Sequence, residues 1–238
     1  MPDTFEVQVD PLLKPTYVLR RYIDLPKYLD LLRTKGLYFR RADKFTDRFE
    51  GALTPAMRRL LNATGADIPD IENADAYYRR AREETYVSCW SRGLHDNMAL
   101  WQLYGGANSS LAVTTTVKQL VEAAVTWQDE TIIKKVKYID HFKNPDMIIG
   151  GYTDTLQFKH LAYSYEDEVR VLVSRHRGEW TKNPVDFRLP IPDLNSFIRS
   201  IVVAPEAEDW FYELVEEVTR LFGVTKPVNW SKLTMLPK

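Results

Sequence analysis

The sequence lacks the features that mark secreted, membrane-spanning and zinc-binding proteins. One cysteine, Cys89, stands in 238 residues, so no disulfide can form within the chain. The four histidines are dispersed, and no Cys or His spacing predicts a metal site. No stretch approaches the roughly 20 apolar residues of a membrane span, and the first residues lack a continuous apolar region. We therefore expect no bound metal, no membrane partner and a reducing, cytoplasmic setting.

Charge and short motifs exclude further classes. The 32 basic and 33 acidic residues give a net charge of -1, so no global field draws the chain to nucleic acid. The sequence contains no Walker A loop, no dinucleotide-binding glycine motif, no zincin motif, no nucleophile elbow and no EF-hand loop. A hydrophobic content of 45% is enough for one substantial core. We expect a single domain over residues 1–238.

Hydrophobic periodicity predicts strands and helices that interleave without regular βαβ spacing. Strands are expected at residues 16–22, 37–39, 86–91, 111–116, 132–139, 168–174 and 197–203. Helices are expected at residues 25–35, 55–61, 77–84, 96–104, 117–125, 147–163 and 206–222. This order predicts an α+β fold with a mixed, mainly antiparallel sheet, continuous or split, flanked by helices.

Local signals set several boundaries. Asp24 and Asp96 are the expected caps of two helices, and Gly36 is the expected end of the first. Residues 62–75 are acidic and rich in turn formers, which is typical of a loop. Pro205 is the expected start of the last helix.

A pair of glutamates precedes the strand at residues 168–174. Glu166 and Glu168 are two residues apart and share a face if the segment is extended. Close carboxylates raise each other's proton affinity, which suits acid–base work. The alternative is a surface acidic turn in which Arg170 pairs with a neighbour.

Residues 40–55 mix charges of both signs with two aromatic rings. Phe45 and Phe49 are expected to anchor this loop to the core. The loop is then either a solvated connection or the rim of a cleft, where Asp47 and Glu50 accept hydrogen bonds from Arg21 or a ligand.

Two arginines lie together in the first strand, and alternation sends Arg20 and Arg21 to opposite faces. An inward arginine either binds a phosphate or carboxylate or forms a structural ion pair. Cys89 or a nearby serine could act as a nucleophile with His95 as base, but a cysteine in an apolar strand is more often an inert core thiol.

A set of blocks resembles a known family. The blocks are RYIDLPKYLDLLRTKGLYFRRADKFTDRFEG, VSCWS, NMALWQLYG, SLAVTTTVKQL, KVKYID and FKHLAYSYEDEVRVLV. In order and spacing they resemble the family called domain of unknown function 2971, over about residues 16–204. Arg48 stands where that family commonly has proline.

A remoter resemblance supplies a mechanism. Arg21 on the first strand, Ser88 and Ser91 on a later strand, and then Glu166 and Glu168 are similar to the arginine–serine–glutamate order of ADP-ribosyltransferases. The resemblance implies that the arginine holds NAD and the serines support the site. It also implies that Glu168 stabilises an oxocarbenium-like transition state and that Glu166 positions the acceptor.

The same resemblance implies the other members of the site. Tyr22 and Trp101 are expected to stack on nicotinamide or adenine, as Trp90 also could. The supporting residues are Asp47, Glu50, Lys159 and Arg170. The expected ligands are NAD as substrate, or another nucleotide, together with an unknown protein or nucleic-acid acceptor. The implied activity is ADP-ribosyl transfer or NAD hydrolysis, with a role in phage defence.

Two other functions remain open from the sequence. The same arginines and glutamates could form a buried ion-pair lattice that supports a non-catalytic binding or regulatory module. Alternatively, Asp43, Asp47, Glu50 and Glu168 could hold a divalent ion in a nuclease.

Overall fold

The computed structural model describes residues 7–47, 49–64, 72–93, 95–143, 147–174 and 184–234. The chain forms two compact units. The first unit consists of Met1–Asp10, Phe39–Cys89 and Gln128–Phe187, and the second unit of Pro11–Tyr38, Trp90–Trp127 and Arg188–Lys238. Strands β3 (Gly36–Arg41), β4 (Thr85–Arg92) and β10 (Asp186–Pro190) contribute residues to both units. That the chain acts as one domain stays a prediction.

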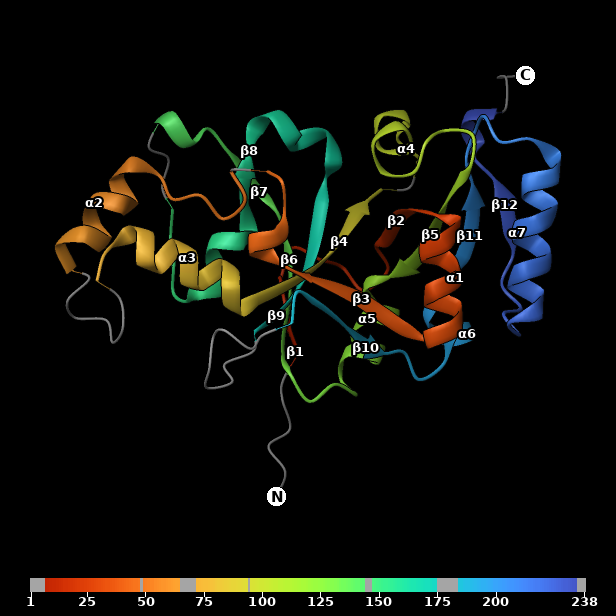
Figure 1. The fold of residues 1–238 in the computed structure, drawn as a ribbon, viewed down its shortest axis with the longest axis horizontal. Coiled ribbons are helices and arrows are strands. Elements are labelled where there is room, and N and C mark those ends of the chain that lie inside the picture. The colour runs from red at the N-terminus through yellow and green to blue at the C-terminus, as the bar shows by residue number, and fades with distance from the viewer. Residues whose placement is uncertain are drawn as a thin grey trace. The chain divides into compact units, whose positions relative to one another are not determined.

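The first unit is built on strands in the order β1 (Val7–Val9), β6 (Glu130–Lys135), β9 (Glu168–Ser174) and β4. β1 is parallel to β6, and β6 is antiparallel to β9. β3 pairs with β4 in antiparallel fashion. A separate parallel pair joins β7 (Lys137–Ile139) to β8 (Phe158–His160). Helices α2 (Pro55–Thr64) and α3 (Ala74–Glu84) lie side by side in this unit (Figure 1).

The loop after β3 is anchored by a phenylalanine, as the sequence predicts. Phe45 packs against a buried cluster formed by Val87, Ile132, Leu156 and Leu172. These residues come from β4, β6, a turn and β9. The loop therefore begins on the apolar core of the first unit, which limits where its later charged residues can lie.

The second unit orders its strands β4, β2 (Val18–Asp24), β5 (Ser110–Thr116), β11 (Ser200–Val203) and β12 (Val228–Trp230). All neighbours are antiparallel except β11 and β12. Its described helices are α1 (Leu25–Thr34), α4 (Met98–Tyr104), α5 (Val117–Ala124), α6 (Leu194–Phe197) and α7 (Asp209–Leu221). In Figure 1, α7 runs beside β12, and the Tyr212 hydroxyl donates to the Val228 carbonyl at 2.9 Å.

These elements confirm the predicted class, an α+β fold with a mixed, mainly antiparallel sheet flanked by helices. Among the described residues, no helix combines the length and the apolar content that a membrane crossing requires. The class follows from short strands and short helices that alternate without a repeating crossover.

Two segments differ from the prediction. Residues 147–163, expected to be helical, instead form the 3-10 turns Tyr152–Gln157 and Leu161–Glu166 on either side of β8. The expected strand at residues 132–139 is broken at Val136 into β6 and β7, which belong to separate sheets. Strands β1, β10 and β12 were not predicted because three to five residues carry little periodicity. Residues 65–71 of the loop expected at residues 62–75 lie outside the described residues, whereas its ends, residues 62–64 and 74–75, belong to helices α2 and α3.

Several predicted boundaries also shift. Asn97, rather than Asp96, caps α4 by accepting the Ala99 N–H at 2.9 Å. Asp96 instead pairs with Arg20 at 3.4 Å, and both side chains are buried. The last helix begins at Asp209 and not at Pro205, and the strand expected at residues 197–203 begins at Ser200 after the short α6.

Gly36 does not end α1 in the predicted way. Lys35 takes the left-handed conformation, with φ at 45°, and Gly36 opens β3. A Cβ added at Gly36 would lie 2.9 Å from the Cβ of Arg188 on β10. The glycine is therefore required by the close approach of two strands in the second unit.

We expect Gly36→Ala to lower the free energy of unfolding by about 1–3 kcal/mol, because the added methyl overpacks a tight strand contact. Urea denaturation of the variant and the wild type measures this difference. Gly151→Ala is the matched control, because a Cβ there meets nothing within 4 Å. Equal losses in the two variants would contradict a steric role for Gly36.

Candidate functional site

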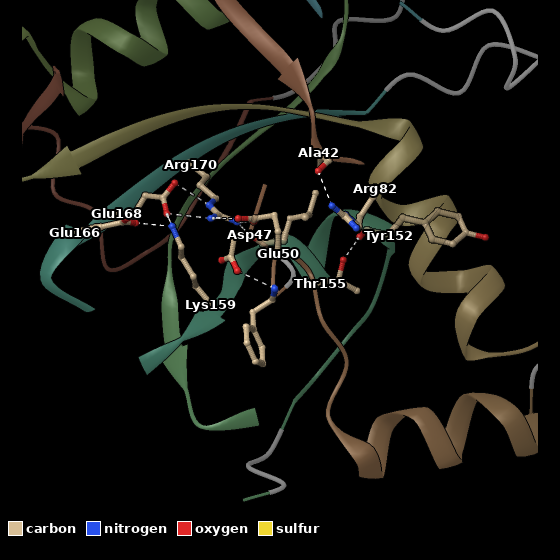
Figure 2. Close-up of polar contacts among 12 residues, drawn as sticks. Ala42, Asp47, Glu50, Arg82, Tyr152, Thr155, Lys159, Glu166, Glu168 and Arg170 are labelled. Atoms are coloured by element: carbon tan, nitrogen blue, oxygen red, sulfur yellow. Dashed lines mark hydrogen bonds and ion pairs between the residues drawn. The ribbon is translucent and has the colours of Figure 1, made fainter. Parts of the chain in front are cut away.

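Five charged residues of the first unit form one buried group, which we call the charged lattice: Glu50, Lys159, Glu166, Glu168 and Arg170. None is more than 6% exposed. Four different segments supply them, namely the loop after β3, β8, the turn that precedes β9, and β9 itself. Figure 2 shows their side chains pointing toward one another.

Arg170 is the centre of the lattice and is 1% exposed. Its Nε donates to Oε1 of Glu168 at 3.0 Å, and one Nη donates to Oε2 of Glu168 and Oε2 of Glu50, both at 3.0 Å. The other Nη donates to Oε1 of Glu50 and, at 2.6 Å, to the Leu156 carbonyl. A guanidinium has five N–H donors, so every donor of Arg170 has an acceptor.

Lys159 brings the two predicted catalytic glutamates together. Its Nζ lies 2.5 Å from Oε2 of Glu166 and 3.3 Å from Oε2 of Glu168. The prediction assumed that this segment is extended. It is not, because Asp167 has a left-handed backbone with φ at 38°. This turn, rather than strand alternation, directs both carboxylates to one ammonium.

The lattice keeps Glu168 ionised. Burial alone would raise the pKa of this carboxyl, but the charges of Arg170 and Lys159 outweigh burial and lower the pKa from 4.5 to about 2. The carboxylates of Glu168 and Glu166 raise the pKa of Lys159, although burial of the ammonium alone would lower it. At neutral pH the site therefore holds a fixed, water-poor negative charge at Glu168.

The lattice contains three carboxylates and two cations, so it carries one excess negative charge if all five groups are ionised. The excess negative charge affects Glu50. Burial and the nearby Glu168 raise the pKa of Glu50, although the charge of Arg170 alone would lower it. Two carboxylates on one guanidinium thus have pKa values that move in opposite directions.

The sequence suggested that Asp47 and Glu50 both lie at the rim of a cleft, but the two carboxylates differ in exposure. Glu50 is 3% exposed and bound by Arg170. Asp47 is half-buried, and its Oδ1 accepts the Phe49 N–H at 2.9 Å (Figure 2). Tyr163 covers Lys159, with 4.7 Å between Nζ and the ring centroid, and burial together with Asp47 raises the pKa of its hydroxyl. Asp47 and Tyr163 are the more exposed neighbours of the lattice.

Cys89, and not Ser88, is the β4 residue that contacts Glu168. Alternation along β4 turns the Ser88 side chain to the opposite face of the strand, where it is fully buried. Burial, followed by the nearby Glu168, raises the pKa of the Cys89 thiol well above its usual value. The thiol is therefore an unreactive hydrogen-bond partner of the carboxylate.

The remaining predicted ligand residues belong to the second unit. Arg21 is half-buried, donates to the Tyr38 carbonyl at 3.3 Å and lies 6.0 Å from the Trp90 ring. Tyr22 and Trp101 pack edge to face with centroids 4.7 Å apart inside a buried cluster, and Trp101 is fully buried. As core rings, they do not present a face for stacking.

Ser91 and Arg20 complete the predicted set on the second unit. Ser91 is half-buried and lies opposite Arg20, across the β4–β2 pairing. Arg20 is 8% exposed, and its Nε donates to the Gly93 carbonyl at 3.3 Å. Arg20 is thus the buried member of the two adjacent arginines, and it pairs with Asp96.

The carboxylates proposed for a metal site have other partners. Asp43 accepts from Arg41 at 2.6 Å and lies 3.0 Å from Lys44, while Glu50 and Glu168 bind Arg170. Within the described ranges, no group of three His, Cys, Asp or Glu side chains is arranged to hold a metal ion.

Sequence reasoning missed two contacts of Glu168. The Tyr138 hydroxyl accepts the Glu168 N–H at 2.8 Å, and the Val136 N–H donates to the Glu168 carbonyl at 2.9 Å. Both residues lie in the segment, residues 132–139, that the sequence predicts as one continuous strand. The break between β6 and β7 at Val136 allows Tyr138 to lie beside Glu168, the first residue of β9.

We expect Arg170→Met to lower the free energy of unfolding by roughly 3–5 kcal/mol, because it leaves two buried carboxylates without their shared partner. Urea denaturation at neutral pH measures the loss. The control is Arg58→Met, which removes an exposed pair with Asp75 and should cost no more than about 1 kcal/mol. Similar losses in both variants would contradict the central role of Arg170.

Acid should remove the contribution of Glu168. Because its pKa is about 2 in the folded protein and 4.5 ordinarily, its ionised form stabilises the fold above pH 4.5, and this contribution is lost as the pH falls toward 2. The difference in unfolding free energy between wild type and Glu168→Gln should therefore shrink across that window. The difference for Glu50→Gln should stay flat there, because the raised pKa of Glu50 moves its titration above 4.5. A constant Glu168→Gln difference would refute the ionised assignment.

Comparison with known proteins gives likenesses to solved structures only at low sequence identity. No family model matches the chain, so the resemblance to domain of unknown function 2971 finds no support there, and no curated protein matches. The chain is similar to DarT from Thermus sp. 2.9 with carba-NAD+, at 10% identity and a TM-score of 0.41 over 92% of this chain and 97% of the other. For DarT with NAD+ the values are 11%, 0.43, 92% and 96%, and for DarT with ADP-ribosylated ssDNA they are 11%, 0.43, 98% and 98%. Such identities and TM-scores carry no conclusion about activity.

Proposed function

We propose that the chain binds NAD and breaks its nicotinamide glycosidic bond, passing ADP-ribose to a protein or nucleic-acid acceptor or to water. The observation that carries the proposal is that Lys159 holds Glu166 and Glu168 together while Glu168 stays ionised. Breaking this bond builds positive charge on the ribose, and a preorganised carboxylate stabilises that charge. The order of Arg21, the β4 serines and the two glutamates along the chain supports the same chemistry.

In this proposal each residue has a separate task. Glu168 faces the ribose as cleavage proceeds, and Glu166 positions the acceptor. Lys159 and Arg170 are positioning residues, because they hold the two carboxylates and do not touch the reacting atoms. That Arg21 binds the pyrophosphate with its planar fork stays a prediction of the chain-order resemblance. A place in phage defence remains a prediction of the same resemblance.

Nicotinamide release from NAD tests the activity. We expect turnover by the wild type and a loss of about a hundredfold or more in Glu168→Gln, because the variant lacks the charge that stabilises the transition state. Glu50→Gln is the matched control, since it also removes one carboxylate from Arg170 but leaves Glu168 in place. Rates are compared per folded molecule, with the folded fraction taken from thermal melting.

Two results would sink the proposal. One is a wild type that releases no nicotinamide with any acceptor and shows no rise in melting temperature with NAD. The other is an equal loss of release in Glu50→Gln and Glu168→Gln, because the effect would then follow from damage to the lattice and not from the loss of one catalytic charge.

A second candidate is a non-catalytic binding module braced by the lattice. The observation that favours it is the complete satisfaction of Arg170, together with the burial of Glu168. Under this proposal both glutamine variants lose stability to a similar extent, because each leaves the guanidinium short of one acceptor. Under the same proposal, neither the wild type nor either glutamine variant releases nicotinamide from NAD.

A further inference from the structure

The helix α7 of the second unit has an inner face that packs on the rest of the unit. Phe211, Val215 and Thr219 are buried on this face, and the Thr219 hydroxyl bonds to that of Tyr28 on α1 at 2.8 Å. Burial of one face is what an amphipathic surface helix requires. The outer face of such a helix is expected to be polar throughout, and on α7 it is not.

An apolar line runs along the outside of α7, and we call it the α7 stripe: Trp210, Leu214 and Leu221. Residues four and then seven positions apart lie close to one line along a helix. Trp210 is 57% exposed, Leu221 is 68% exposed, and Leu214 is half-buried. A single exposed apolar side chain is ordinary, but three in line form the kind of seam on which another helix packs.

The exposed indole is held in one position. Its Nε1 donates to Oε2 of Glu208 at 2.8 Å, and its ring packs edge to face on Phe211, with centroids 5.7 Å apart. A side chain that is already ordered loses little entropy when a partner binds. Trp210 therefore has the properties of a binding anchor, since tryptophans of this kind supply much of the affinity at protein interfaces.

The charges on the outside of α7 are almost all negative. Among the described residues, no ion pair involves Asp209, Glu213, Glu216 or Glu217. The cations of the neighbouring helix α1 are already engaged, because Lys27 pairs with Asp24 and Arg33 pairs with Asp30. The exposed charged side chains of α7 are Asp209, Glu213, Glu216, Glu217 and Arg220.

The stability of the helix does not explain this acidic face. Glu213 is four residues from both Asp209 and Glu217 and three from Glu216, and like charges at these spacings destabilise a helix. The helix dipole favours carboxylates only near the first turn, whereas Glu216 and Glu217 lie in the second half of α7. The unpaired carboxylates are complementary to a partner that carries positive charge.

We propose that the α7 stripe is a docking surface for a basic amphipathic helix of a partner protein. The apolar side chains of the partner pack on Trp210, Leu214 and Leu221, and its lysines or arginines lie against the neighbouring carboxylates. The same carboxylates oppose nucleic acid, an anionic membrane and the α7 face of a second copy, which are all negatively charged. The proposal rests on the second unit alone and does not depend on cleavage of NAD.

Calorimetric titration of the full chain with a synthetic peptide tests the surface. The probe is a lysine–leucine peptide of roughly 18 residues with leucines at helical spacing, and its counterpart has glutamate in place of lysine. We expect the lysine peptide to bind and to lose about tenfold in affinity between roughly 50 mM and 300 mM salt, because the attraction is electrostatic. The glutamate peptide should not bind.

Variants then locate the contact. Trp210→Ala should weaken binding of the lysine peptide by about tenfold or more, because it removes the anchor. The double change Glu213→Gln and Glu217→Gln should weaken binding and also reduce its dependence on salt. Thermal melting should show that these exposed changes leave the fold intact.

Leu103→Ala and Glu122→Gln are the matched controls, because each alters an exposed side chain of the same unit on another helix. Both should bind the lysine peptide as the wild type does. No binding to the wild type, equal binding of the two peptides, or unchanged affinity in Trp210→Ala would overturn the proposal. Self-association that sedimentation velocity detects in the wild type but not in Trp210→Ala would also overturn it, because the occupant would then be a second copy.

Discussion

The first unit depends on the neutralisation of one buried guanidinium. Arg170 lies on a central strand with 1% exposure, and a cation in such a place is tolerated only when all its donors are paired. Its acceptors come from Glu50, 120 residues earlier in the chain, from the Leu156 carbonyl and from Glu168. The requirement to satisfy Arg170 thereby fixes the loop after β3 and the turn before β8 against β9.

The same requirement produces the chemistry of the site. A carboxylate that must neutralise a buried cation is held rigidly, remains ionised and is shielded from water, which are the conditions under which a fixed charge acts most strongly on a substrate. Glu168 meets these conditions because Lys159 and Arg170 lower its pKa. Structural pairing and catalytic preorganisation therefore have one physical origin here. An ionised, buried glutamate is expected both in an enzyme and in a non-catalytic binding module.

Much of the fold was predictable because its signals are local. The cap at Asp24, the strand at residues 168–174 and the anchor at Phe45 all follow from neighbouring residues, and the structure contains each of them, although β9 is buried on both faces and not half-buried as its alternating sequence predicts. The residues of the lattice could be predicted, but not their pairing. Arg170 and Glu50 are 120 residues apart, and such a contact produces no periodic pattern in the sequence. Residues 147–163 were misread because tertiary contacts with β7 and α3, rather than propensity, decide their backbone.

Errors in side-chain direction explain the rest of the misreadings. The prediction that Glu166 and Glu168 share a face depends on an extended segment, which the structure does not have; the left-handed backbone at Asp167 brings both carboxylates to Lys159 instead. On β4, alternation does hold, and it turns Ser88 away from Glu168 while placing Cys89 beside it. A single residue of backbone geometry thus decides which side chains meet.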